Sequence, residues 1–422
     1  MNPRVQQVTD AAPPGGLFDA KTWKVSPEAF PLDAGQVEDL EQLGQRLWVF
    51  LKACNLLYRR SVTGDAPEWI ARWMDAGKPA DLVEISRSRA LKNELPRVLR
   101  PDLLLTDDGW AMSELDSLPG GIGLTAWLNQ TYAALGDDVI GGPQGLRDAM
   151  HRLHPVGPVV VAQEAATYRP EFEWLFGVDR VKAAETYSFD GQPVYRFFEA
   201  FDWPNLPTVR GSWSPEARLT PPLKPFLEEK LWLALYWMNP LREFWRKELG
   251  ERYQKDLDAI IPRGWVVDPT PLPPHAVLPG LEVQSWEEVM RFSQKQRDLV
   301  LKISGFSALA WGSRGVTIGS DVSQEEWAGS LRAALDGFDR SPFILQRFHK
   351  ARVVEHPYWD ADKNEVRVQR GRARICPYYV VENDRAHLRG VLVTIVPADK
   401  KIIHGMSDAI LVPARMAGNE AT

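Results

Sequence analysis

A lysine and an arginine that flank a loop of small residues have the clearest chemical potential in this sequence. Lys302 follows an apolar run typical of a strand, and Arg314 lies among glycines and serines before a second apolar pair. Glycines let backbone N–H groups approach a ligand closely, serine hydroxyls add donors, and the cations add charge. A polyphosphate fits this combination, although an ordinary surface hairpin has the same local pattern and the spacing is not that of a P-loop. The candidate ligands of such an anion are Lys302, Ser304, Ser307, Gly312, Arg314 and Gly315.

Two acids beside a glycine corner form a second candidate site. Glu114 and Asp116 end a predicted hairpin that turns at an Asp-Gly pair, and Gly120 and Gly121 follow them. Carboxylates next to such a corner can hold an amine or ammonium group. The alternative is that both acids cap the N-terminus of the helix that the corner opens.

Arginines form the third candidate. Between residues 341 and 376, basic residues outnumber acidic ones, although the whole chain has a net charge of −6. Arg367, Arg372 and Arg374 lie in a segment that predicts a hairpin turned at Gly371. Close together they would form an anion-binding wall. The alternative is a solvated strand face, which is common in antiparallel sheets.

Helical and strand patterns alternate along the chain and must position these residues. Apolar residues recur at helical spacing from Val37 to Leu57, and Ser323 with Glu326 forms a capping box that begins a helix to Leu335. Other helices are predicted at 66–77, 168–177, 223–238, 241–260 and 285–296, strands at 156–163, 299–301, 316–318, 342–348 and 388–414, and hairpins at 103–112, 187–198 and 365–381.

Composition excludes several classes of protein. A net charge of −6 gives no basic field for nucleic acid. Two cysteines, Cys54 and Cys376, indicate a reducing, cytoplasmic compartment and exclude a disulfide scaffold. The polar start does not read as a signal peptide, and no apolar run approaches 18 residues, so no membrane span is expected.

The order of these pieces resembles the ATP-grasp superfamily, and within it the glutathionylspermidine synthase-like branch with a pre-ATP-grasp domain. The pieces are a glutamate-bearing hairpin with a Pro-Gly-Gly corner, a lysine strand with a Gly-Ser-Arg-Gly loop, a Phe-Ile-Leu-Gln strand and an arginine-rich segment ending in Pro-Tyr-Tyr-Val-Val. The resemblance covers residues 80–200 and 265–415. It implies an α+β fold, ATP-grasp-like, with an N-terminal pre-ATP-grasp α/β domain.

The resemblance also implies roles for the matched residues. Lys302 would reach the nucleotide phosphates, and Gln346 would lie on the strand that contacts the adenine. Arg372 and Arg374, together with Arg314, would face the transferred phosphate. The residues implied on the acceptor side are Glu114, Asp116, Gly120 and Gly121.

The family activates a carboxylate as an acyl phosphate, which an amine then attacks. The resemblance therefore implies an ATP-dependent carboxylate–amine ligase with small-molecule substrates and with ATP and Mg2+ as cofactors. The acidic pair that holds Mg2+ in the family is not evident, since Asp399 and Asp408 lack a ligand spacing. A non-catalytic nucleotide- or partner-binding protein is therefore the alternative. A third hypothesis is an unrelated α+β enzyme that binds carbohydrate or peptide through its tryptophans. The sequence indicates neither the substrates nor the oligomeric state.

Four consecutive parts are expected along the chain. They are a flexible lead at 1–20, a helical and pre-ATP-grasp α/β domain at 21–202, a loop and helical insert at 203–264, and an ATP-grasp-like nucleotide-binding region at 265–415.

Overall fold

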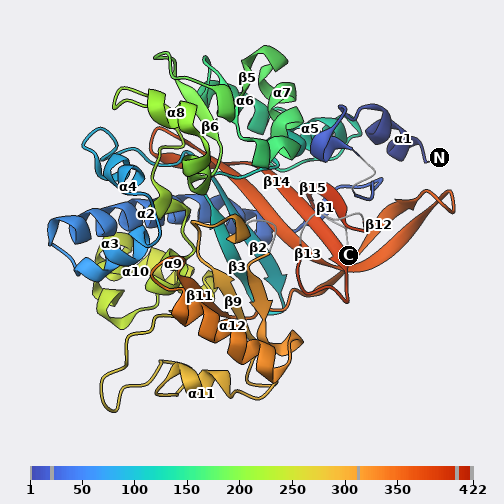
Figure 1. Cartoon of the computed structure of the whole chain (residues 1–422). Coiled ribbons are helices and arrows are strands. Elements are labelled where there is room, and N and C mark those ends of the chain that lie inside the picture. Colours follow the sequence, from blue (N-terminus) through green and yellow to red (C-terminus); the bar gives the residue numbers. More distant parts are fainter. Residues whose placement is uncertain (1, 20–22, 311–313, 404–407, 419–422) are drawn as a thin grey trace. The chain divides into compact units, whose positions relative to one another are not determined.

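The computed structural model describes residues 2–19, 23–310, 314–403 and 408–418. They form two compact units that interleave along the chain (Figure 1). Unit 1 comprises Met1–Phe50, Ser88–Leu223 and Lys350–Thr422, and unit 2 comprises Leu51–Arg87 and Lys224–His349. The four expected parts are consecutive blocks, whereas each unit is assembled from separate segments. No described helix is long and apolar enough to cross a membrane.

A seven-stranded sheet forms the centre of unit 1. Its order is β1-β15-β14-β13-β2-β3, with β12 paired to β13, and all neighbours are antiparallel except β1 and β15. Helix α2 packs on this sheet, since the Tyr379 hydroxyl donates to Leu40 O at 2.6 Å and a Cβ on Gly44 would lie 2.4 Å from the Tyr379 ring. The strands are β1 (Phe30–Leu32), β2 (Val98–Thr106), β3 (Gly109–Asp116), β12 (Val353–Asp360), β13 (Glu365–Glu382), β14 (Arg385–Pro397) and β15 (Ile410–Met416).

The predicted hairpin at Gly371 is wrong. Strand β13 runs straight through Gly371, and its turns lie at Asn364 and at Asn383-Asp384, which have positive φ angles (Figure 1). A Cβ on Gly371 would lie 2.5 Å from Val396 O on β14. This glycine therefore marks a close approach between two strands, and not a turn.

A second, parallel sheet in unit 1 has the order β5-β4-β6-β7. The predicted strand at 156–163 is confirmed as β4. The predicted hairpin at 187–198 is wrong, because β6 pairs in parallel with β4 and the Asp190-Gly191 turn only leads into it. The loop expected after residue 203 contains a short helix and strand. The elements are β4 (Val159–Val161), β5 (Val181–Ala183), β6 (Val194–Phe197), β7 (Leu219–Thr220), α6 (Gly145–Leu153), α7 (Arg169–Phe176) and α8 (Pro207–Ser212).

The expected flexible lead contains a helix, α1 (Pro3–Asp10). The Asn2 side chain accepts from the Arg4 backbone N–H at 3.0 Å and so caps the helix. Val5 and Val8 lie one turn apart and are fully buried, and Arg4 pairs with Asp137 at 2.6 Å. Two apolar side chains on one face and one ion pair therefore fix a segment whose composition indicates flexibility.

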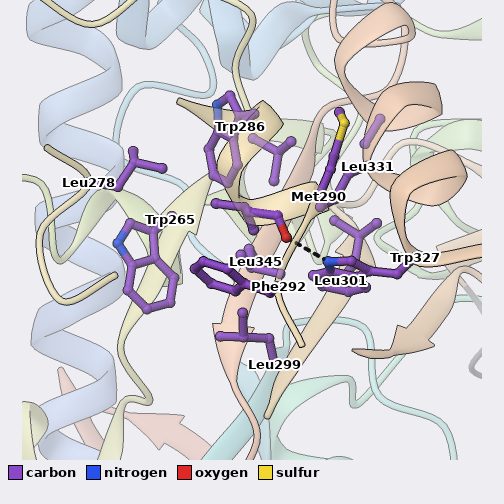
Figure 2. Close-up of a cluster of buried hydrophobic side chains, with 13 residues drawn as sticks. Trp265, Leu278, Trp286, Met290, Phe292, Leu299, Leu301, Trp327, Leu331 and Leu345 are labelled. Atoms are coloured by element: carbon purple, nitrogen blue, oxygen red, sulfur yellow. Dashed lines mark hydrogen bonds between the residues drawn. The ribbon is translucent and has the colours of Figure 1, made fainter. Parts of the chain in front are cut away.

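Unit 2 contains an antiparallel sheet of order β10-β9-β11-β8. One face carries Trp265, Leu301 and Leu345 into a buried core with Trp327 of α12, whose indole Nε1 donates to Val289 O at 2.9 Å (Figure 2). The predicted strand–loop–strand around Lys302 and the capping box of α12 are confirmed. The elements are β8 (Gly264–Val266), β9 (Leu299–Ile303), β10 (Val316–Ile318), β11 (Phe343–Arg347), α11 (Trp286–Met290) and α12 (Gln324–Asp336).

The remaining helices include both confirmed and corrected predictions. The long helix predicted from Val37 is confirmed as α2. The single helix predicted at 223–238 is wrong, because a short 3-10 turn begins at Pro225 and Glu229 is extended before α9 begins. Gly250 interrupts α10 with a φ of 74°. These helices are α2 (Ala34–Thr63), α3 (Glu68–Asp75), α4 (Ala80–Arg87), α5 (Ile122–Ala134), α9 (Leu231–Leu235) and α10 (Arg242–Ile260).

Candidate functional site

The lysine expected to bind phosphate lies on the sheet of unit 2. Lys302 on β9 is flanked by Ile344 of β11 and Val316 of β10. Side chains alternate across a strand, so Leu301 enters the tryptophan-rich core and Lys302 belongs to the opposite face. Lys302 is half-buried, which suits a lysine whose stem packs against the sheet while its ammonium reaches for an anion.

Gln346 belongs to the same face of this sheet. It lies on β11 opposite Val300, two residues along from the partner of Lys302, and is 1% exposed. Its amide nitrogen Nε2 has no hydrogen-bond partner among the described residues. A buried donor without a partner costs free energy, and a ring nitrogen of a nucleotide base would satisfy it. The structure therefore brings Lys302 and Gln346 to one face.

Two serines of the loop, Ser304 and Ser307, are used within the protein. Ser304 is buried, and its hydroxyl accepts from Leu231 N at 3.0 Å and donates to the Glu229 carboxylate. Ser307 Oγ accepts from Leu309 N at 3.2 Å. Ser304 is therefore an anchor of the loop, and its hydroxyl has no donor left for a phosphate.

The far side of the loop is held to β9 by its backbone. Gly315 O accepts from Ile303 N at 3.1 Å, and a Cβ on Gly315 would lie 2.5 Å from the Ile303 side chain. Arg314 is exposed, and its guanidinium donates to Ala308 O at 2.9 Å. Gly312 lies outside the described residues. A side chain at residue 315 would push this end of the loop away from Lys302.

A further lysine reaches the end of β9. The backbone N–H of Lys230 donates to Ser304 O at 3.4 Å, two residues after Lys302. In the helix predicted at 223–238, Lys230 would be an ordinary surface residue. Only the extended backbone at Glu229 brings it here, and no local pattern predicts that break.

A buried polar cluster in unit 1 contains one of the expected arginines. Asp102 on β2 is 4% exposed and accepts from Arg100 Nε at 3.0 Å, from Arg374 Nη1 at 2.9 Å and from Cys376 Sγ at 3.3 Å. Burial would raise the pKa of Asp102, but the charges of Arg100 and Arg374 outweigh it and hold the pKa below its usual value. Arg374 is thus neutralised by a protein carboxylate. The sequence signal for this cluster is the pair of charged residues Arg100 and Asp102, which lie on either side of Pro101 in an otherwise apolar strand.

The Gly120-Gly121 corner is closely packed. Gly120 O accepts from the Tyr378 hydroxyl at 2.7 Å and from Arg100 Nη1 at 3.1 Å, and a Cβ on Gly120 would lie 2.2 Å from the Tyr168 ring. Gly121 has a φ of 81°, and a Cβ there would meet the Tyr378 hydroxyl at 2.6 Å. Both glycines are therefore required by two tyrosine rings that press on the corner.

The two acids before this corner lie in the same cluster. Asp116 forms an ion pair with Arg100 at 3.1 Å and accepts a hydrogen bond from Leu118 N at 2.8 Å, and burial raises its pKa to about 6. Glu114 is half-buried on β3, opposite Asp102. Asp116 does not cap the helix at residues 120–125, because the backbone N–H from which it accepts, that of Leu118, lies before the corner.

The acid at the start of α5 comes from another helix. Glu171 of α7 is 1% exposed, and its Oε2 accepts from Leu124 N at 2.9 Å. Burial raises its pKa to about 7, although backbone donors at Leu124, Gly123 and Gly121 oppose the rise. Sequence reasoning missed this cap because Glu171 follows Leu124 by 47 residues, and no pattern near Gly121 indicates it.

Arg372 is not part of an open wall. It is 8% exposed and donates to the backbone carbonyls of Ala398, at 2.9 Å, and Ala351. Arg367 lies on the other face of β13 and pairs with Asp360 at 3.2 Å. The expected group of three arginines is therefore split, and Arg374, 21% exposed in its side chain, is the member beside the acids.

The donor sets favour a nucleotide over a metal. Lys302, the Gln346 amide and the backbone of a glycine-rich loop suit a phosphate chain and a base. Among the described residues, no group of three or more His, Cys, Asp or Glu side chains is placed to hold a metal ion.

No protein-family model and no curated protein matches this chain. A solved structure of a glutathione synthetase-like effector from Globodera pallida is similar over 98% of this chain and 96% of that chain, with a TM-score of 0.52 and 10% identity. The chain has an ATP-grasp-like α+β fold. A candidate gamma-glutamylcysteine synthetase from Methylobacillus flagellatus is similar over 94% of this chain and 91% of that chain, with 12% identity and a TM-score of 0.41, which is too low to support an argument.

Proposed function

We propose that this protein is an ATP-dependent carboxylate–amine ligase, related to the glutathionylspermidine synthase-like branch with a pre-ATP-grasp domain. The observation that carries the proposal is that Lys302 and Gln346 belong to one face of the unit 2 sheet, beside a glycine-rich loop, and that the Gln346 Nε2 has no hydrogen-bond partner among the described residues. The charge of the lysine suits phosphate, and the amide suits a base. The ATP-grasp-like fold supports the same assignment.

The proposed reaction proceeds in two steps. An oxygen of the substrate carboxylate attacks the γ-phosphorus of ATP, which forms an acyl phosphate and releases ADP. The amine then attacks the acyl carbon, an amide bond forms, phosphate leaves, and the amine loses a proton. Lys302 and Arg314 would balance the phosphate charge.

A non-catalytic nucleotide-binding protein is the second candidate. The observation that favours it is the state of the two arginines expected at the transferred phosphate. Arg372 is held by backbone carbonyls and Arg374 by Asp102. A protein of this kind would bind ATP through unit 2 without turning it over.

Addition of ATP is expected to stabilise the protein. At a hundredfold excess over the dissociation constant, a ligand that binds only the folded state adds about 2.7 kcal/mol to the free energy of unfolding. Thermal melting with ATP, ADP and no nucleotide measures this, and melting with ATP plus a panel of carboxylates and amines tests the ligase. An unchanged melting temperature at millimolar ATP would contradict both candidate functions.

Lys302→Met is expected to weaken ATP binding about 10- to 100-fold while leaving the fold intact. The reason is that a charge-assisted hydrogen bond contributes about 1.5–3 kcal/mol, and methionine keeps the apolar stem of the lysine. Titration calorimetry with ATP measures the change. Lys295→Met, at an exposed position before β9, is the matched control and should bind ATP as wild type does. Equal affinities of the two variants for ATP would show that Lys302 does not bind the nucleotide and is only a surface residue.

A further inference from the structure

A fully buried ion pair lies next to the start of the loop in unit 2. Lys78 and Glu229 form a direct salt bridge, and their side chains are 0% and 1% exposed. Lys78 follows α3, and Glu229 is the extended residue before α9. Removing one partner of such a buried pair strongly destabilises the folded protein, because the other charge stays buried without compensation.

The Glu229 carboxylate also holds three consecutive loop residues. One oxygen accepts from the Ser304 hydroxyl, and the other accepts from Phe306 N at 3.3 Å. A Cβ on Gly305 would lie 2.9 Å from the Glu229 carboxyl carbon, so this glycine is required by the close approach. The Lys78 ammonium lies 5.4 Å from the centre of the Phe306 ring. The buried Lys78–Glu229 pair therefore fixes the position of residues 304–306.

We infer that Glu229 is a positioning residue for nucleotide binding, and that the Lys78–Glu229 pair sets the path of the chain directly after Lys302. This inference rests on the proposed function. Glu229 makes no contact with the nucleotide in this proposal. It fixes the backbone of 304–306 before the ligand arrives, so that less conformational entropy is lost on binding. The backbone bond from Ser304 N to Pro342 O, 2.9 Å, joins the same residues to the start of β11, the strand of Gln346.

Glu229→Gln tests the inference, with Lys78→Met/Glu229→Gln as a second variant that leaves no buried charge. An amide has one acceptor oxygen where the carboxylate has two, so either the Ser304 hydroxyl or the Phe306 N–H loses its acceptor in both variants. We expect hydrogen exchange of the peptide spanning 299–310 to become faster without ATP. We expect the dissociation constant of ATP, measured by calorimetry on folded protein, to rise about tenfold or more.

Asp258→Asn is the matched control. Asp258 accepts from the Tyr236 hydroxyl at 2.6 Å and from Arg242 Nη2 at 3.0 Å, so the variant also breaks a hydrogen-bonded ion pair of unit 2. Its melting temperature should fall while its affinity for ATP stays at the wild-type value, which separates positioning from general destabilisation.

Two results would overturn the inference alone. One is a folded double variant whose dissociation constant for ATP lies within about twofold of wild type, and the other is unchanged exchange at 299–310. Wild-type protein that binds no ATP would instead overturn the proposed function, and the role of Glu229 with it.

Discussion

Asp102→Asn is expected to lower the free energy of unfolding by about 3–5 kcal/mol at neutral pH. The carboxylate is 4% exposed and receives hydrogen bonds from two guanidinium groups, those of Arg100 and Arg374. Asparagine offers one oxygen and no charge, so two partly buried cations would be left facing each other. Denaturant unfolding followed by tryptophan fluorescence measures the loss.

Asp360→Asn is the control for this prediction. Asp360 also pairs with an arginine of β13, Arg367 at 3.2 Å, but the Arg367 side chain is 44% exposed near the start of the strand. Exposed ion pairs contribute little, so this variant should unfold as wild type does. An Asp102→Asn protein as stable as the Asp360→Asn protein would show that the cluster contributes no net stability.

Glu171→Gln is expected to gain about 2–3 kcal/mol of stability relative to wild type as the pH rises from 5 to 8. Burial raises the pKa of Glu171 from 4.5 to about 7 in the folded protein. A group whose folded pKa is raised contributes stability below its unfolded pKa and loses it as the pH rises through the folded pKa. Glutamine does not titrate, so the variant escapes this loss.

The difference between variant and wild type is the quantity to measure. His154 and His356, whose pKa values burial lowers to about 4, lose stability in the opposite direction as the pH falls below about 6.5, so the wild-type profile alone is mixed. Glu173→Gln, which removes another glutamate of the same helix, is the control and is measured over the same pH range. A difference between Glu171→Gln and wild type that stays constant from pH 5 to 8 would mean that the Glu171 carboxyl stays ionised and adequately solvated in α7.

Local patterns predicted much of the fold. The apolar alternation around Lys302 gave β9 and β10, the Asp-Gly turn gave the β2–β3 hairpin, and the capping box at Ser323 gave the start of α12. Each of these features is decided by neighbours within a few residues along the chain. The resemblance added the ATP-grasp-like fold, which no local pattern specifies.

Glycine positions were harder to interpret. Gly371 has the same local context as a turn glycine, yet it is required by the backbone of β14. The sequence alone does not separate these two uses, because the neighbouring strand is specified only by the tertiary fold. The prediction at Asp190-Gly191 failed for a related reason, since the strand after that turn pairs with β4 and not with the segment before it.

The candidate site was predictable where a residue acts through its own strand. Lys302 was singled out by its place after an apolar run, and Gln346 was implied by the family resemblance. Glu229, Asp102 and Glu171 were not, because each draws its importance from partners far along the chain. Burial and partner geometry, which decide whether a carboxylate is an anchor, a counter-ion or a cap, exist only after folding.

The interleaved units have a consequence for the order in which the chain is made. β1 leaves the ribosome long before its partner β15, and the β2–β3 hairpin long before β13, so the central sheet of unit 1 stays incomplete through most of translation. All segments of unit 2 have been synthesised once His349 is added, before any residue of β12 to β15. Unit 2 can therefore fold before the central sheet of unit 1 is complete. Until then, strands of unit 1 that lack their partners stay exposed, and exposed strand edges of this kind are bound by chaperones.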